Sequence, residues 1–202
     1  MKFLLRNKSN LVKFITTYSI LTWFTVLIFA IWVAKGINTV FIYKIGILSG
    51  QVAVILFCLT LLPGISHRFK FKSTLITLLI IVRRQLGIAM FSASFLHYSS
   101  IRLLPILFSS VSTNLNPPLF EIFGLLTLYP LFFLFITSNN FAVKSLKFWW
   151  GKIHKIIYIL TWTLFFHIAL QEFGIWTVIL ATFALMETLS LLYFYCQKST
   201  SS

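Results

Sequence analysis

The sequence predicts an all-α integral membrane protein with six transmembrane helices, forming one domain over residues 1–202. Two observations carry this prediction: 59% of the residues are hydrophobic with a mean hydropathy of +0.95, and only 10% are charged. A soluble domain of this size cannot bury so much apolar surface. Several apolar runs also reach the roughly 20 residues that a helix needs to cross a bilayer core.

The apolar runs place the expected spans at 14–34, 45–63, 85–104, 119–137, 150–170 and 174–196. The first run follows a basic flank, as in a signal peptide, but it is too long for a signal-peptide core. The stretch 74–82 is too short to cross, so it forms either an interfacial helix or an extension of the third span. Residues 109–120 are rich in Ser, Asn and Pro and predict a loop, with Pro117-Pro118 starting the next helix.

The net charge of +14 gives the orientation. The basic residues lie between apolar runs, which indicates membrane topology and contact with anionic lipids of the bilayer rather than nucleic-acid binding. With the N-terminus inside, the inner segments hold Lys2, Arg6, Lys8, Lys13, Arg68, Lys70, Lys72, Arg83, Arg84, Lys144, Lys147, Lys152, Lys155 and Lys198. The outer segments hold Lys35, Lys44 and Arg102. Both termini, with tails 1–13 and 197–202, are therefore expected in the cytoplasm of a cell carrying this protein in its inner or plasma membrane.

Histidines inside the spans need a reason, because polar groups are costly in a bilayer. His97 lies about 20 Å along the third span from Arg84, at 1.5 Å per residue. His167 lies about 22–27 Å along the fifth span from its inner boundary, by the same rise. Both spans run outward, so the two histidines are expected at a similar depth. His154 is expected near the inner surface, and His67 in a solvated basic loop.

Two histidines at one depth on different helices can ligate a haem iron from both faces. Such bis-histidine ligation leaves no open iron position and suits electron transfer better than oxygen chemistry. Zinc is the alternative metal, but it usually takes four ligands, often Cys or carboxylate. A third interpretation is that each histidine only packs and hydrogen-bonds against a neighbouring helix.

The spacing of His154 and His167 does not put them on one face of a straight helix. Thirteen positions correspond to a rotation of roughly 140° away from alignment and a rise of about 20 Å. Either the two rings face different neighbours, or a bend realigns them. The rise would allow two metal centres at different depths. At the depth of His154, however, the third span carries Arg83 and Arg84 and offers no obvious histidine partner.

Three segments of the sequence resemble the ferric-reductase-like transmembrane family, in its YedZ/MsrQ-like branch. They are "VRRQLGIAMFSASFLHY" at 82–98, "PLFFLFITSNNFAVKSLKFWWGKIHKIIYILTWTLFFHIAL" at 130–170 and "GILSGQVAVILFCLTLLPG" at 46–64. The shared features are an RRxLG start to a span ending in His, a TSN turn, and a span with Trp, His, Tyr and a second His in order. The resemblance covers roughly 46–170.

This resemblance implies a haem b protein with the haem in the helix bundle. Residues matching His97 and His167 ligate one haem in the family, and the match to His154 is assigned to a second haem or its vicinity. The branch passes electrons from a cytoplasmic flavin reductase or quinol to an acceptor outside, in one case a molybdopterin enzyme that repairs oxidised methionine. Other relatives reduce ferric iron with fused flavin and nicotinamide domains. The 202 residues leave no room for such domains, so an external donor is implied and no catalytic residue is assigned.

Several other residues allow two interpretations. Arg83 and Arg84 could neutralise haem propionates or the phosphate of a flavin at the cytoplasmic side, or could simply mark the inner side. Gly87 and Gly124 allow close approach of a flat macrocycle or, more simply, of a neighbouring helix. Trp149-Trp150 are expected to anchor the chain at the inner boundary.

The positions of the three acidic residues bear on two competing functions. Glu121 and Glu172 are expected to be solvated at outer ends, whereas Glu187 lies within the last span with no partner that the sequence identifies. A small proton-coupled transporter or channel would use the histidines and Glu187 along one path. A membrane assembly factor without any cofactor is the third function considered.

Overall fold

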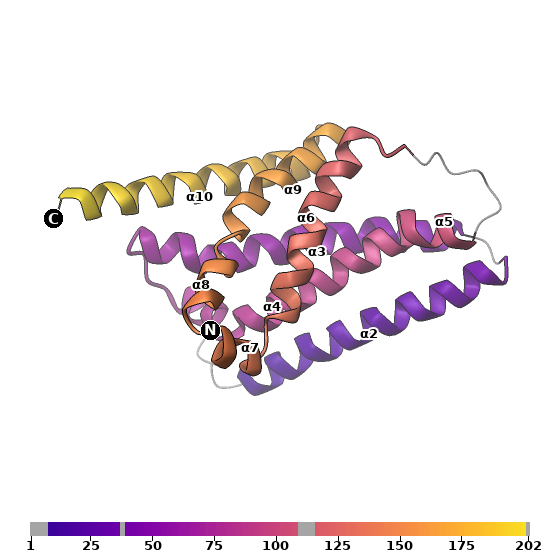
Figure 1. The fold of residues 1–202 in the computed structure, drawn as a ribbon, viewed down its shortest axis with the longest axis horizontal. Coiled ribbons are helices and arrows are strands. Elements are labelled where there is room, and N and C mark those ends of the chain that lie inside the picture. Colours follow the sequence, from indigo (N-terminus) through magenta and orange to yellow (C-terminus); the bar gives the residue numbers. More distant parts are fainter. Residues whose placement is uncertain (1–7, 37–38, 109–115, 201–202) are drawn as a thin grey trace.

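The computed structural model describes residues 8–36, 39–108 and 116–200, and this part of the chain is all-α (Figure 1). The long helices are α2 (Lys8–Ala34), α3 (Val40–Arg68), α4 (Thr74–Tyr98), α6 (Leu119–Ile136), α9 (Ile157–Gln171) and α10 (Ile175–Thr200). The short ones are the π-helix η1 (Ser99–Leu103), α5 (Leu104–Phe108), α7 (Asn140–Leu146) and α8 (Phe148–His154).

Six segments of the described chain are helical, long and apolar enough to cross a membrane, as the sequence predicts. The third runs from Thr74 to Phe108, so the stretch 74–82 extends that span and is not a separate interfacial helix. The first two helices also extend beyond the predicted spans, from Lys8 and up to Arg68. Helical hydrogen bonding continues past the apolar run into the polar boundary, where Lys and Arg side chains reach water.

Two helix starts follow from local chemistry. The Ser73 hydroxyl accepts a hydrogen bond from the Ile76 N–H at 3.2 Å and caps α4. Pro118 is the residue before α6, as the Pro-Pro pair predicts. Most of the predicted loop, 109–115, lies outside the described residues.

The fifth span is not one straight helix. α8 ends at His154 and α9 begins at Ile157, with the Ile156 N–H bonding the Ile153 carbonyl at 3.1 Å in the turn between them. This break lies between His154 and His167, where the thirteen-residue spacing suggests a bend.

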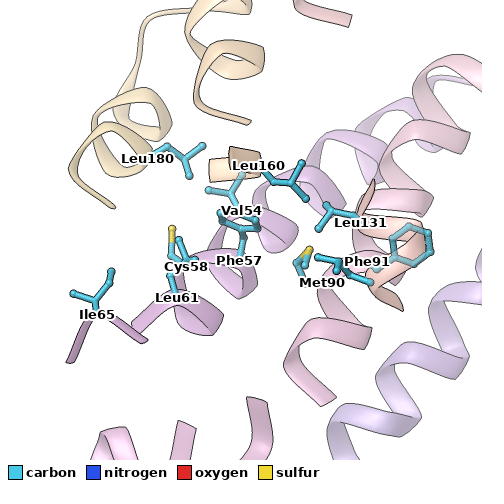
Figure 2. Close-up of a cluster of buried hydrophobic side chains, with 11 residues drawn as sticks. Val54, Phe57, Cys58, Leu61, Ile65, Met90, Phe91, Leu131, Leu160 and Leu180 are labelled. Atoms are coloured by element: carbon cyan, nitrogen blue, oxygen red, sulfur yellow. The ribbon is translucent and has the colours of Figure 1, made fainter. Parts of the chain in front are cut away.

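Figure 1 shows α2, α3, α4 and α10 running lengthwise, with α6 and the α8–α9 span crossing them steeply. α3 packs against α4, α4 against α2, α9 against α6 and α10, and α10 against α3. The helices that carry His97 and His167, α4 and α9, are not among the closely packed pairs. They meet instead through a buried core that includes Phe57, Phe91 and Leu160 (Figure 2).

Candidate functional site

His97 lies in the last turn of α4 and its ring turns toward α3. Its Nδ1 donates a hydrogen bond to the Gly46 carbonyl oxygen at 2.9 Å, because a carbonyl can only accept. The ring fills the space beside Gly50, where a Cβ atom would lie 2.8 Å from Nδ1. Glycine is therefore required at position 50 for the ring to lie there.

His167 on α9 repeats this arrangement against α6. Its Nδ1 donates to the Phe120 carbonyl oxygen at 2.7 Å, and a Cβ atom at Gly124 would lie 2.8 Å from Nδ1. In both cases the acceptor carbonyl is four residues before the glycine. We call each pair of carbonyl and glycine a histidine seat. Gly124 thus permits close approach by an imidazole ring rather than by a macrocycle or a whole helix.

The two seats fix the chemistry of the rings. With Nδ1 protonated and bonded, a neutral imidazole keeps its lone pair on Nε2, which is the usual arrangement of a metal-ligating histidine. Both side chains remain partly exposed, and the two imidazoles are near enough to interact electrostatically. Each ring therefore has an Nε2 atom that is not used by its seat and that could hold a cofactor iron.

Other polar groups lie beside this pair. The π-helix η1 directly follows α4, and within it the buried Ser99 and Ser100 hydroxyls have no hydrogen-bond partner among the residues that the structure describes. Such π-turns are frequent at functional sites. In the described ranges, no three His, Cys, Asp or Glu side chains form a group that could hold a metal ion. The donor set therefore fits haem better than zinc, which usually takes four ligands.

His154 has a different environment. Its Nε2 lies 3.2 Å from the Thr137 hydroxyl, which itself donates to the Phe133 carbonyl at 2.7 Å and so accepts from Nε2–H. The Trp150 ring stacks on the imidazole at a centroid distance of 4.2 Å, and its Nε1–H donates to the Thr137 carbonyl. The lone pair left to His154 is therefore on Nδ1. No described histidine faces it, and its predicted role as a metal ligand stays a prediction.

Arg83 and Arg84, the two arginines predicted to lie near a cofactor, have different partners. Arg84 donates from Nη1 to the Asn140 side-chain oxygen at 2.6 Å and so joins α4 to α7. Arg83 interacts electrostatically with both His154 and Glu187. The structure thus brings Arg83 and His154 together, away from the His97–His167 pair.

The sequence reasoning missed the partner of Glu187. Glu187 is 2% exposed, and its Oε2 lies 2.6 Å from Arg68 Nη2. Arg68 also donates to the Ser190 hydroxyl at 2.8 Å and the Tyr158 hydroxyl at 3.2 Å. The expectation that His67 lies in a loop is wrong, because α3 continues through His67 to Arg68. The Arg68 guanidinium turns back along that helix to within 3.6 Å of a Cβ placed at Gly64.

Glu121 is also paired, which corrects the expectation that it is simply solvated. Its Oε2 lies 3.2 Å from Arg102 Nε, and both side chains are about one-fifth exposed. Arg102 belongs to η1, and Glu121 follows Phe120, whose carbonyl accepts from His167. This ion pair therefore holds the first turn of α6, which carries one histidine seat, against η1.

No family model matches the chain, and no solved structure matches it.

Proposed function

We propose that this chain is a haem b-binding transmembrane electron-transfer protein of the ferric-reductase-like type, YedZ/MsrQ-like, in which His97 and His167 would hold the haem iron. The bound haem iron would supply a one-electron ferric–ferrous couple. It would be fed by a cytoplasmic donor, a flavin reductase or quinol. The acceptor would lie on the other side, either ferric iron or a methionine sulfoxide reductase.

One observation carries the proposal: two histidines on separate helices are seated alike, each with Nδ1–H donated to a main-chain carbonyl. The seats hold the tautomer and the ring orientation before any ligand binds. The glycines let each ring lie flat against its neighbouring helix. Both rings are partly buried among apolar helices, and such burial would influence the potential of a bound haem.

The donor and acceptor sides follow from the basic residues. The α2 start, the α3 end, the α4 start, α7 and α8 lie at one end of the structure (Figure 1). This end carries most of the Lys and Arg residues, which supports its assignment to the cytoplasm. His154, Arg83 and Arg84 lie toward this end, where an electron donor would approach.

The test is a reduced-minus-oxidised visible spectrum of the purified full chain, with His97→Ala, His167→Ala and the control His67→Ala. His67 is exposed at the end of α3, so its replacement removes a histidine without touching either seat. We expect sharp b-type bands in the wild type and in His67→Ala, and their loss in the other two variants. Absence of haem from the wild type after expression with ample haem would overturn the proposal.

The transporter alternative is not favoured by any contact. It needs Glu187 and the histidines along one path, but Glu187 is neutralised by Arg68, and His97 and His167 bond main-chain carbonyls. A buried ion pair of this kind holds helices together without requiring proton movement.

A further inference from the structure

α7 and α8 form a helical pair between α6 and the rest of the fifth span. Lys147 joins them with φ of 44°, a positive value that turns the chain sharply. The Asn139 side chain accepts from the Ala142 N–H at 2.8 Å and caps α7. Ala142 is buried, and Trp150 and His154 are partly buried, so these residues form the inward side of the pair.

The outward side combines four lysines with three aromatic rings. The lysines are exposed: Lys144, Lys147, Lys152 and Lys155. Phe141 is 80% exposed, Phe148 71% and Trp149 62%. We call these seven residues the α7–α8 surface. Lys152 Nζ lies 4.4 Å from the Phe148 ring centroid and 4.7 Å from that of Trp149, so cation and rings share one patch.

The charge of this surface is not balanced locally. No Asp or Glu occurs between Glu121 and Glu172, so the segment that builds the surface is purely basic. Another cation, Arg84 of α4, also hydrogen-bonds to this segment, at the Asn140 side chain. Four uncompensated cations on one short segment favour an anionic partner.

We propose that the α7–α8 surface binds the headgroups of anionic phospholipids in the leaflet at this end of the protein. Exposed lysines attract anionic headgroups, and Phe and Trp side chains are favoured at the boundary between headgroups and acyl chains. The chain holds the surface at that boundary, because α6 ends at Ile136 and α9 begins at Ile157. This inference does not depend on a haem.

An acidic soluble protein is the other partner that four lysines would attract. The aromatic residues decide against it, since three large rings exposed within a turn or two of two membrane spans would lie among lipid. The two helices are short, with seven residues each, so they leave the rings at the level of the headgroups rather than lifting them into solution.

The test uses the full chain reconstituted in phosphatidylcholine bilayers with spin-labelled phosphatidylglycerol or spin-labelled phosphatidylcholine as the probe. Electron paramagnetic resonance gives the motionally restricted fraction of each, and hence their relative association constant. The variant changes all four lysines: K144Q, K147Q, K152Q and K155Q. We expect its preference for phosphatidylglycerol to fall at least about fivefold, roughly the factor that one lysine contributes near an anionic surface.

The matched control changes four exposed lysines at the same end of the molecule: K8Q, K13Q, K70Q and K72Q. It removes the same charge as the first variant but leaves the α7–α8 surface intact, so we expect a clearly smaller fall in the preference for phosphatidylglycerol. The helical circular dichroism spectrum of both variants checks that they fold. Equal falls in both variants would overturn the proposal in favour of a general charge effect. An unchanged lipid preference in the α7–α8 variant, with lost electron uptake from a soluble donor, would overturn it in favour of protein docking.

Discussion

The His97–His167 pair and His154 show how the same side chain can be prepared for different chemistry. Each member of the pair fills the space over a glycine and donates from Nδ1, whereas His154 lies against Trp150 and donates from Nε2. The glycine nearest to His154 in α8 is also different, because a Cβ at Gly151 would meet nothing within 4 Å. The comparison teaches that histidines in membrane spans of one chain can differ in which ring nitrogen their hydrogen bonds leave available.

The largest expected effect comes from filling a histidine seat. Gly50→Ala or Gly124→Ala puts a Cβ 2.8 Å from the ring nitrogen, so the ring must move and Nε2 loses its orientation. We expect most of the haem to be lost from either variant, measured as the ratio of haem absorbance to protein.

The controls for this prediction are Gly87→Ala and Gly151→Ala, which add the same methyl group into open space. We expect both to keep the wild-type haem content. Equal loss across all four variants would mean that the seats have no special role and that the comparison above is wrong.

The next largest effect concerns the buried ion pair. Arg68→Gln or Glu187→Gln leaves one charge uncompensated, which typically destabilises by about 3–5 kcal/mol. The double variant should be less destabilised than the sum of the two, since it leaves no lone charge. Thermal unfolding in detergent measures all three variants, and simple additivity would contradict the pairing seen between the two side chains.

A smaller effect on haem is expected from His154→Ala. The variant removes a ring whose Nε2–H is engaged by Thr137 but leaves both seats intact. We expect the spectrum of the His97–His167 site to be retained, with changes confined to electron uptake from the donor. A halved ratio of haem to protein would instead place a second haem at His154 and revise the division between the two regions.

The smallest effect is expected at the partly exposed Arg102–Glu121 pair. Glu121→Gln removes an ion pair that is typically worth about 0.2–1 kcal/mol at such exposure. Because Glu121 follows the carbonyl that accepts from His167, we expect a slight shift of the haem potential in a redox titration. A large loss of haem would contradict this small effect and would show that the seat on α6 cannot keep its structure without the ion pair.

Hydropathy was sufficient to predict the six spans, because the bilayer demands long apolar runs regardless of tertiary detail. Helical rise likewise brought His97 and His167 into consideration as a pair. The seats could not be predicted, since they depend on the rotation of α3 and α6 about their axes. The partner of Glu187 could not be predicted, because α3 extends beyond its apolar run to Arg68 and the Arg68 side chain then turns back along its own helix.

Each seat lies within its own pair of neighbouring helices, with His97 held by α3 and His167 by α6. The two histidines can therefore be oriented independently, one in each helical hairpin, as the chain is inserted into the membrane. In biogenesis, a cofactor entering afterwards would meet two seats that are each already formed, in helices that the buried core holds together.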